Sequence, residues 1–195
     1  EEITTIYEAQ MSLYEKWIND NEITKKIKFN FIGNLDLLPI NYIKKCKRLE
    51  DITKKNVGRI CNNLVAYSGQ YEMIEAFKQI KNIEKIKNPD DFYQYLGIKT
   101  PIDLIIRTGF EKRFSNCPLF QTAYAEFYFA DFHYPDLTIE KLMRDGIVPN
   151  YNYSRMIALD EARKCSTTGA LNHICTTSAN DTVNINIERK DDLSF

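Results

Sequence analysis

The sequence lacks an excess of either charge and lacks a long apolar stretch. Its 26 Lys and Arg residues balance 27 Asp and Glu residues, which leaves a net charge of −1 over 195 residues. Such a chain has no global field to attract nucleic acid or an anionic membrane, so we expect no nucleic-acid partner and expect any anion site to be local. No apolar run approaches the roughly 18 residues that a membrane-spanning helix needs, and no segment has the pattern of a signal peptide.

The chain lacks a cysteine arrangement typical of two kinds of site. The five cysteines are odd in number, lie far apart and include no C-x-x-C pair. This usage disfavours a disulfide framework and a zinc site, and it is typical of a reducing compartment. It predicts a cytoplasmic protein.

Aromatic side chains, in contrast, are abundant. The chain carries 12 Tyr and 11 Phe, with 44% hydrophobic and 27% charged residues. These proportions are typical of a soluble domain with a substantial core. The aromatic residues fit either a large core or an apolar ligand cavity, and a core is the more common explanation.

Helix-like and strand-like patterns alternate along most of the chain. Apolar residues recur at three- and four-residue steps from Ile3 to Ile18, which predicts an amphipathic helix, and residues 27–32 alternate as a strand does. This order predicts an α/β fold with a mainly parallel sheet flanked by helices. The other predicted elements are a helix after Pro39, a strand from Ile60 to Tyr67, a helix through Ile74, Phe77 and Ile80, a short helix near Pro89, a strand at 102–106, a short helix from Pro118 and a strand at 126–130.

The pattern changes at about residue 145. Residues 154–164 could form a helix, but residues 166–181 are rich in Thr, Ser, Asn and Ala, and the ending is charged. We therefore divide the chain into a domain at 1–144 and a divergent, loosely ordered tail at 145–195, which this composition favours over a second domain.

One polar segment follows the strand predicted at 102–106. Ligands of open α/β sheets bind beyond the carboxyl ends of strands, and the segment from Arg107 to Asn116 contains two arginines, a lysine and Ser115 at that place. Arginine offers a fork of donors that matches phosphate oxygens, and a helix beginning near Pro118 would add backbone N–H groups. The segment predicts a phosphate or diphosphate site. The alternative is a surface loop whose arginines pair with Glu111 and other acids.

Three blocks of sequence resemble the cis-prenyltransferase (undecaprenyl diphosphate synthase-like) family over about residues 1–140. Residues 103–136 read DLIIRTGFEKRFSNCPLFQTAYAEFYFADFHYPD, which is similar to the family pattern D-L-I-R-T-[GS]-G-E-x-R-[LI]-S-N, continuing through Q-x-A-Y-x-E-L-Y-F-x-D to W-P-D-F. Residues 31–39 resemble F-I-G-D-x-x-x-L-P, and residues 66–76 resemble N-Y-G-G-R-x-[DE]-I-x-x-A.

The resemblance implies a transferase that condenses isopentenyl diphosphate with an allylic prenyl diphosphate to make a cis-polyprenyl diphosphate. It implies that Arg107, Arg113 and Ser115 hold the diphosphate of isopentenyl diphosphate, and that Glu126 helps to place Mg²⁺. It also implies a homodimer or heterodimer, and peripheral membrane association through the apolar product.

The chain departs from the family pattern in several places. The family's aspartate and D-G-N-x-R-W-A motif are absent from these residues, and Glu1 and Glu2 resemble the end of its later R-P-x-E-E motif. The resemblance therefore implies a C-terminal portion that lacks the N-terminal strands and would not turn over substrate alone. Phe110 stands where glycine is usual, Gln70 where arginine is common, and the tail lacks the family's R-x-G-like ending. Phe110 and the tail leave open a second function, a non-catalytic accessory subunit of a heteromeric cis-prenyltransferase. A third alternative is a phosphate-binding module with unrelated chemistry.

Overall fold

The structure, a computed structural model, describes residues 2–145, 172–178 and 182–188. Short 3-10 turns at Leu35–Leu37, Ile83–Lys85, Phe120–Thr122 and Tyr134–Asp136 connect the main elements. The helices are α1 (Glu2–Asn19), α2 (Asn21–Lys26), α3 (Ile40–Thr53), α4 (Gly69–Gln79), α5 (Pro89–Tyr93) and α6 (Ile139–Arg144). The strands are β1 (Ile27–Ile32), β2 (Arg59–Leu64), β3 (Leu104–Arg107), β4 (Glu126–Phe129), β5 (Asn172–Ser178) and β6 (Thr182–Glu188).

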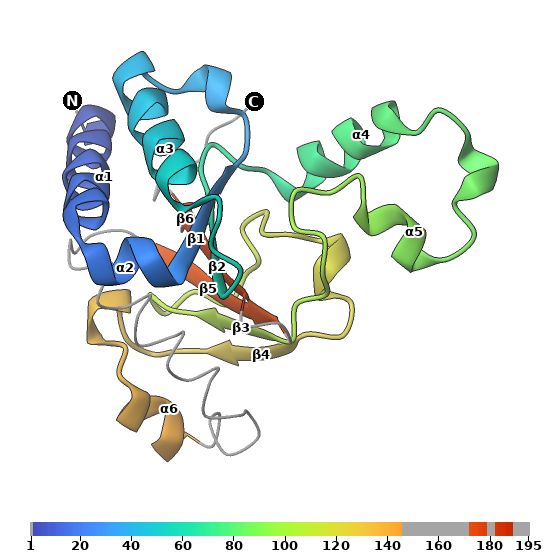
Figure 1. Cartoon of the computed structure of the whole chain (residues 1–195). Coiled ribbons are helices and arrows are strands. Elements are labelled where there is room, and N and C mark those ends of the chain that lie inside the picture. The colour runs from blue at the N-terminus through green and yellow to red at the C-terminus, as the bar shows by residue number, and fades with distance from the viewer. Residues whose placement is uncertain (1, 146–171, 179–181, 189–195) are drawn as a thin grey trace.

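The strands form one six-stranded sheet in the order β1-β2-β6-β5-β3-β4 (Figure 1). Three pairs of neighbouring strands are parallel: β1 with β2, β2 with β6, and β3 with β4. Only β5 runs against its neighbours, β3 and β6. The predicted α/β class with parallel strands and flanking helices is therefore confirmed, with one antiparallel strand inside the sheet.

The main core lies between α1, α3 and one face of β1. Ile27, Phe29 and Phe31 are buried on that face because alternate residues of a strand point the same way. Trp17 of α1 stacks on Phe29 with ring centroids 5.0 Å apart, and Tyr14 meets Phe31 edge-on at 5.1 Å. Much of the aromatic content is thus core.

A buried polar chain joins α1 to α3 inside this core. The Tyr42 hydroxyl donates to Gln10 Oε1 at 2.7 Å and lies 2.9 Å from the Tyr14 hydroxyl. Burial raises the pKa of Tyr14 well above its ordinary value, so both phenols are neutral in the folded protein. Buried hydroxyl groups need such partners, since a buried polar group without a hydrogen bond is costly.

Most of the predicted elements exist, with shifted ends. The predicted strand at 60–67 ends earlier, at Leu64, because Ala66 adopts a left-handed conformation with φ of 46° and turns the chain. The short helix predicted from Pro118 is wrong: the structure has a three-residue 3-10 turn at Phe120–Thr122. Within the described residues, the structure has no helix both long and apolar enough to cross a bilayer.

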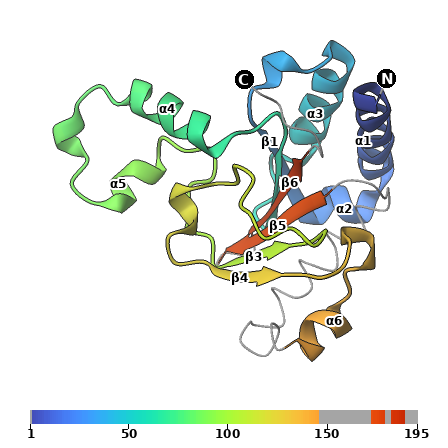
Figure 2. The ribbon, with the colours of Figure 1, turned by 180° about the vertical axis from the view of Figure 1, so that it is seen from behind.

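Two segments of the predicted tail, Asn172–Ser178 and Thr182–Glu188, form strands β5 and β6. β5 and β6 form a hairpin that inserts between β2 and β3, in the middle of the sheet (Figure 2). β3 is buried along its whole length, so its backbone N–H and C=O groups need partners on both sides, and the hairpin supplies one side. The helix predicted at 154–164 lies outside the described residues, and the division at residue 145 stays a prediction.

A separate small cluster builds the lobe of α4 and α5, which projects away from the sheet in both views (Figures 1 and 2). Ala76, Phe92 and Leu96 are its buried centre, and Phe120 packs on it with its ring 4.8 Å from that of Phe92. The lobe is therefore held to the sheet through the turn at Phe120–Thr122, which follows the segment singled out in the sequence.

Candidate functional site

Arg107 ends the buried strand β3 at the carboxyl edge of the sheet. Its residue exposure is only 2%, and Thr108 beside it is fully buried. The Ala130 amide donates to the Arg107 carbonyl at 2.7 Å, and the Gly109 amide donates to the Phe132 carbonyl at 2.8 Å. The backbone thus leaves the sheet at a fixed point, as expected for a site at the ends of parallel strands.

The segment from Arg107 to Asn116, here called the cationic loop, folds back on its own first residue. Arg107 Nη2 donates to Ser115 Oγ at 3.1 Å. Ser115 and Asn116 have φ of 46° and 61°, two left-handed residues in succession that reverse the chain. The structure therefore brings together two of the three residues predicted to hold a diphosphate.

Arg113, the third of them, points to a different partner. Its Nη1 lies 2.5 Å from Glu111 Oε2, and its side chain is 67% exposed. This contact is the surface pairing that the alternative interpretation of the loop predicted. An exposed ion pair is worth about 0–1 kcal/mol, so a more highly charged ligand could displace Glu111.

Phe110 occupies a backbone conformation that favours glycine. Its φ is 63°, and its side chain is 60% exposed with the ring 5.3 Å from that of His133. A bulky side chain with positive φ is strained by contact between Cβ and the backbone. Phe110 therefore differs from the usual glycine in residue type and also holds a backbone conformation that suits glycine better.

Glu126, the predicted metal ligand, lies at the other end of the strand pair. It is the exposed first residue of β4 and stands beside Leu104, whereas Arg107 stands beside Phe129. Three residues of parallel strand span about 10 Å. Within the described residues, no three His, Cys, Asp or Glu side chains gather in a way that could hold a metal ion. The described residues thus do not form a metal site from three or more such side chains.

The amino end of α4 packs against the cationic loop, a contact that the sequence analysis missed. The Gly69 amide donates to the Asn116 carbonyl at 2.9 Å, and the Gln70 amide donates to Asn116 Oδ1 at 3.3 Å. Asn116 Nδ2 donates to Ser68 Oγ at 2.9 Å. The Ser-Gly pair after a predicted strand was the available signal, since serine is a preferred N-cap.

Glu72, in the first turn of α4, ties three further segments together. Its carboxylate accepts from the Tyr67 hydroxyl at 2.7 Å, from the Gly97 amide at 2.9 Å and from Gln121 Nε2 at 3.1 Å. Burial and the neighbouring carboxylate raise the pKa of Tyr67, so the phenol stays protonated and donates. No sequence motif predicted this network, because its hydrogen bonds join residues as far as 49 positions apart along the chain.

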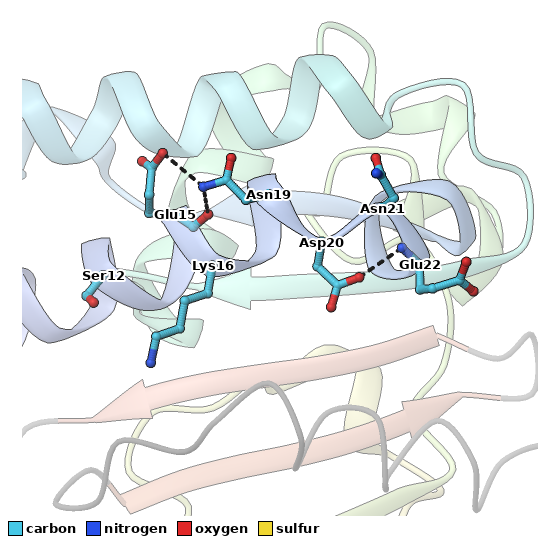
Figure 3. A pocket seen from close by; sticks show the side chains of 7 residues that line it. All are labelled: Ser12, Glu15, Lys16, Asn19, Asp20, Asn21 and Glu22. Atoms are coloured by element: carbon cyan, nitrogen blue, oxygen red, sulfur yellow. Dashed lines mark hydrogen bonds between the residues drawn. The ribbon is translucent and has the colours of Figure 1, made fainter.

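A surface hollow beside α1 and α2 lies elsewhere on the molecule (Figure 3). Three of its charged side chains, those of Glu15, Asp20 and Glu22, have structural roles. Asp20 Oδ1 caps α2 by accepting from the Glu22 amide at 2.8 Å, and Glu22 pairs with Lys26 at 2.7 Å. Glu15 pairs with Lys45 at 2.9 Å. The hollow contains no residue of the cationic loop, and its chemistry is explained by helix capping and surface pairing.

Comparison with known proteins gives one consistent result. The Prenyltransf family model, which describes undecaprenyl diphosphate synthase, matches residues 1–155. The chain is 31% identical over 154 residues to the tritrans,polycis-undecaprenyl-diphosphate synthase (geranylgeranyl-diphosphate specific) of Methanopyrus kandleri. It is 36% identical over 143 residues to the ditrans,polycis-undecaprenyl-diphosphate synthase ((2E,6E)-farnesyl-diphosphate specific) of Haemophilus influenzae. These alignments cover 74% and 66% of this chain but only 57% and 59% of the two relatives.

Solved structures agree with the sequence comparison. A probable undecaprenyl diphosphate synthase from Campylobacter jejuni superposes with a TM-score of 0.67 at 29% identity, over 77% of this chain and 73% of that chain. Lavandulyl diphosphate synthase from Lavandula x intermedia, in complex with dimethylallyl diphosphate, gives a TM-score of 0.60 at 26% identity, over 76% of this chain and 67% of that chain.

Proposed function

Because the chain belongs to the undecaprenyl diphosphate synthase (Prenyltransf) family, we propose that it serves a transferase that condenses isopentenyl diphosphate with an allylic prenyl diphosphate. The product is a cis-polyprenyl diphosphate. The named relatives are synthases for prenyl diphosphates, which does not favour a non-catalytic accessory subunit. Their names give different allylic substrates, so we propose an allylic prenyl diphosphate as the class of primer and do not name one member of it.

The pairing of Arg107 with Ser115 carries this proposal. Ser115 Oγ accepts from Arg107 Nη2, which leaves the hydroxyl proton of Ser115 to donate to a phosphate oxygen. Arg107 is 2% exposed, so an anion that reaches it interacts across a medium of low dielectric constant, where the attraction is stronger than in water.

Arg113 is proposed as the second guanidinium of the site. Its exposed side chain can leave Glu111 and turn to a diphosphate that carries more charge than one carboxylate. A charge-assisted hydrogen bond is worth about 1.5–3 kcal/mol, so loss of either arginine should weaken binding about tenfold or more. Holding two diphosphates side by side against their repulsion is the main task of such residues in the reaction.

Mg²⁺ and Glu126 enter the proposal only through the family resemblance. Mg²⁺ is usually held by one or two carboxylates together with substrate phosphates, and it would neutralise charge on the leaving diphosphate. Glu126 is a single carboxylate at the far end of the strand pair from Arg107, so it could hold the ion only with phosphate oxygens and further ligands.

A homodimer or heterodimer is proposed through the outer strand β4. β4 is the last strand of the sheet, and its Phe127 and Phe129 are each 39% exposed. Phe114 of the cationic loop, 41% exposed, adds a third ring 4.9 Å from that of Phe127. An aromatic edge strand is a typical association surface. Peripheral membrane association would follow from the apolar product.

Binding of isopentenyl diphosphate, measured by titration calorimetry, tests the proposal at the site. We expect the chain to bind, and Arg107→Ala and Arg113→Ala to weaken binding about tenfold or more. Arg48→Ala is the matched control, since Arg48 is an exposed arginine 3.9 Å from Glu15 and far from the loop. Equal binding by all four proteins contradicts the proposal. Turnover is tested separately, by an assay of whether the full-length gene product condenses isopentenyl diphosphate with farnesyl diphosphate.

A further inference from the structure

We propose that Asn116 is a positioning residue that fixes the cationic loop on the amino end of α4, so that Ser115 stands correctly for the diphosphate. The inference rests on the proposed function, because it assigns Ser115 its role there. Its own basis is a separate set of contacts between two segments more than 45 positions apart in the sequence.

Asn116 uses its backbone and both ends of its side-chain amide in this contact. Its carbonyl and Oδ1 accept from the amides of Gly69 and Gln70 at 2.9 and 3.3 Å, and its Nδ2 donates to Ser68 Oγ at 2.9 Å. The first amides of a helix have no partner within the helix, so Asn116 supplies what a cap would supply. Side chain and backbone of one residue thus join two elements.

The packing at Gly69 shows how closely the two elements approach. A Cβ atom at Gly69 would lie 2.3 Å from the Cys117 carbonyl oxygen and 3.2 Å from that of Asn116. Real Cβ atoms do not approach a carbonyl oxygen so closely, so any other residue would push α4 and the loop apart. Glycine at this position is therefore a condition for the three hydrogen bonds.

The same contact holds Ser115 in a conformation that serine rarely adopts. Ser115 has φ of 46° and Asn116 has φ of 61°. Asparagine tolerates the left-handed region, whereas serine there is held by its surroundings. With Asn116 fixed on one side and Arg107 bonded to Oγ on the other, the Ser115 hydroxyl keeps one position. Loss of the contact should let the serine relax and weaken diphosphate binding.

The test compares two asparagine-to-glycine variants in the complete chain. Asn116→Gly keeps the positive φ but removes two side-chain hydrogen bonds. Asn56→Gly is the matched control. Half-buried Asn56 lies in a distant loop, and its side chain also donates two hydrogen bonds, to the Thr24 and Ile27 carbonyls at 2.7 and 2.8 Å. We expect the dissociation constant for inorganic pyrophosphate, measured by calorimetry, to rise about fivefold or more in the first variant and to stay unchanged in the second.

Two further measurements distinguish a failure of the positioning role from a failure of the proposed function. Gly69→Ala should weaken pyrophosphate binding by pushing the same contact apart from the α4 side. Combined with Asn116→Gly it should add little, because both changes break the same contact. Amide exchange at Gln70, whose acceptor Asn116 Oδ1 is removed, should accelerate in Asn116→Gly and not in Asn56→Gly. A wild-type chain that fails to bind pyrophosphate overturns the proposed function. Wild-type binding that Asn116→Gly and Gly69→Ala both leave unchanged overturns the positioning role alone.

Discussion

Glu111 and Arg113 of the cationic loop form an ion pair with each other, with 2.5 Å between Oε2 and Nη1. The pair has a cost for the proposed function, because the guanidinium that should meet the diphosphate is already engaged. We expect Glu111→Gln to bind pyrophosphate severalfold more tightly than wild type, since the variant loses both the competing pair and a nearby negative charge. Titration calorimetry at two salt concentrations measures this, and the gain should shrink at the higher salt. Unchanged or weaker binding would show that Glu111 supports the site instead.

Phe110 gives a second prediction. Glycine at this position would relieve the strain of a positive φ, worth about 1–2 kcal/mol, and lose a ring contact worth about 0.5–1.5 kcal/mol. We therefore expect Phe110→Gly to keep its free energy of unfolding within about 1 kcal/mol of wild type. Phe114→Gly, which relieves no such strain, should lose clearly more. Urea unfolding of both variants decides this, and equal losses would contradict the interpretation.

Glu50 gives a prediction about pH. Burial raises the pKa of this carboxyl above its ordinary value of 4.5, although the Phe31 amide donates to it at 2.8 Å. The native state therefore binds the proton more tightly than the unfolded state, and this carboxyl's contribution to stability falls as pH rises through the window above 4.5. We expect Glu50→Gln, which keeps the acceptor, to be more stable than wild type at pH 7 but not at pH 4.

The contrasting variant is Glu22→Gln. A hydrogen bond from Lys26 lowers the pKa of Glu22, so its contribution to stability is present above 4.5 and is lost as pH falls. Thermal unfolding at pH 7 should give shifts of opposite sign for the two variants relative to wild type, and both shifts should shrink toward pH 4. Shifts of the same sign would contradict the assignment at Glu50.

The hairpin of β5 and β6 gives a prediction about the sheet. Removal of residues 146–195 would expose the inner edges of β2 and β3, whose buried backbone groups would lose their partners. We expect the shortened chain to lose cooperative urea unfolding, whereas removal of residues 189–195 alone should leave the transition in place. A truncated chain that unfolds in the wild-type transition would show that the hairpin is dispensable.

The sequence alone determined the fold class, most elements and the place of the site, for local reasons. Residues 27–32 alternate with period two, and Arg107 follows a short apolar strand, so the carboxyl edge of the sheet was readable from spacing. The hairpin left a local signal as well. Val183, Ile185 and Ile187 alternate with polar residues, but a composition rich in Thr, Ser and Asn suggested disorder.

Only the tertiary structure decided which predicted site residues meet. It placed Ser115 on Arg107, left Arg113 with Glu111, and separated Glu126 from Arg107 by the length of a strand. It also joined Asn116 to the amino end of α4. The spacing of residues along a chain determines the periodicity within one helix or strand. The contacts between elements depend instead on strand register, on the close approach at Gly69 and on the left-handed residues, none of which the spacing reveals.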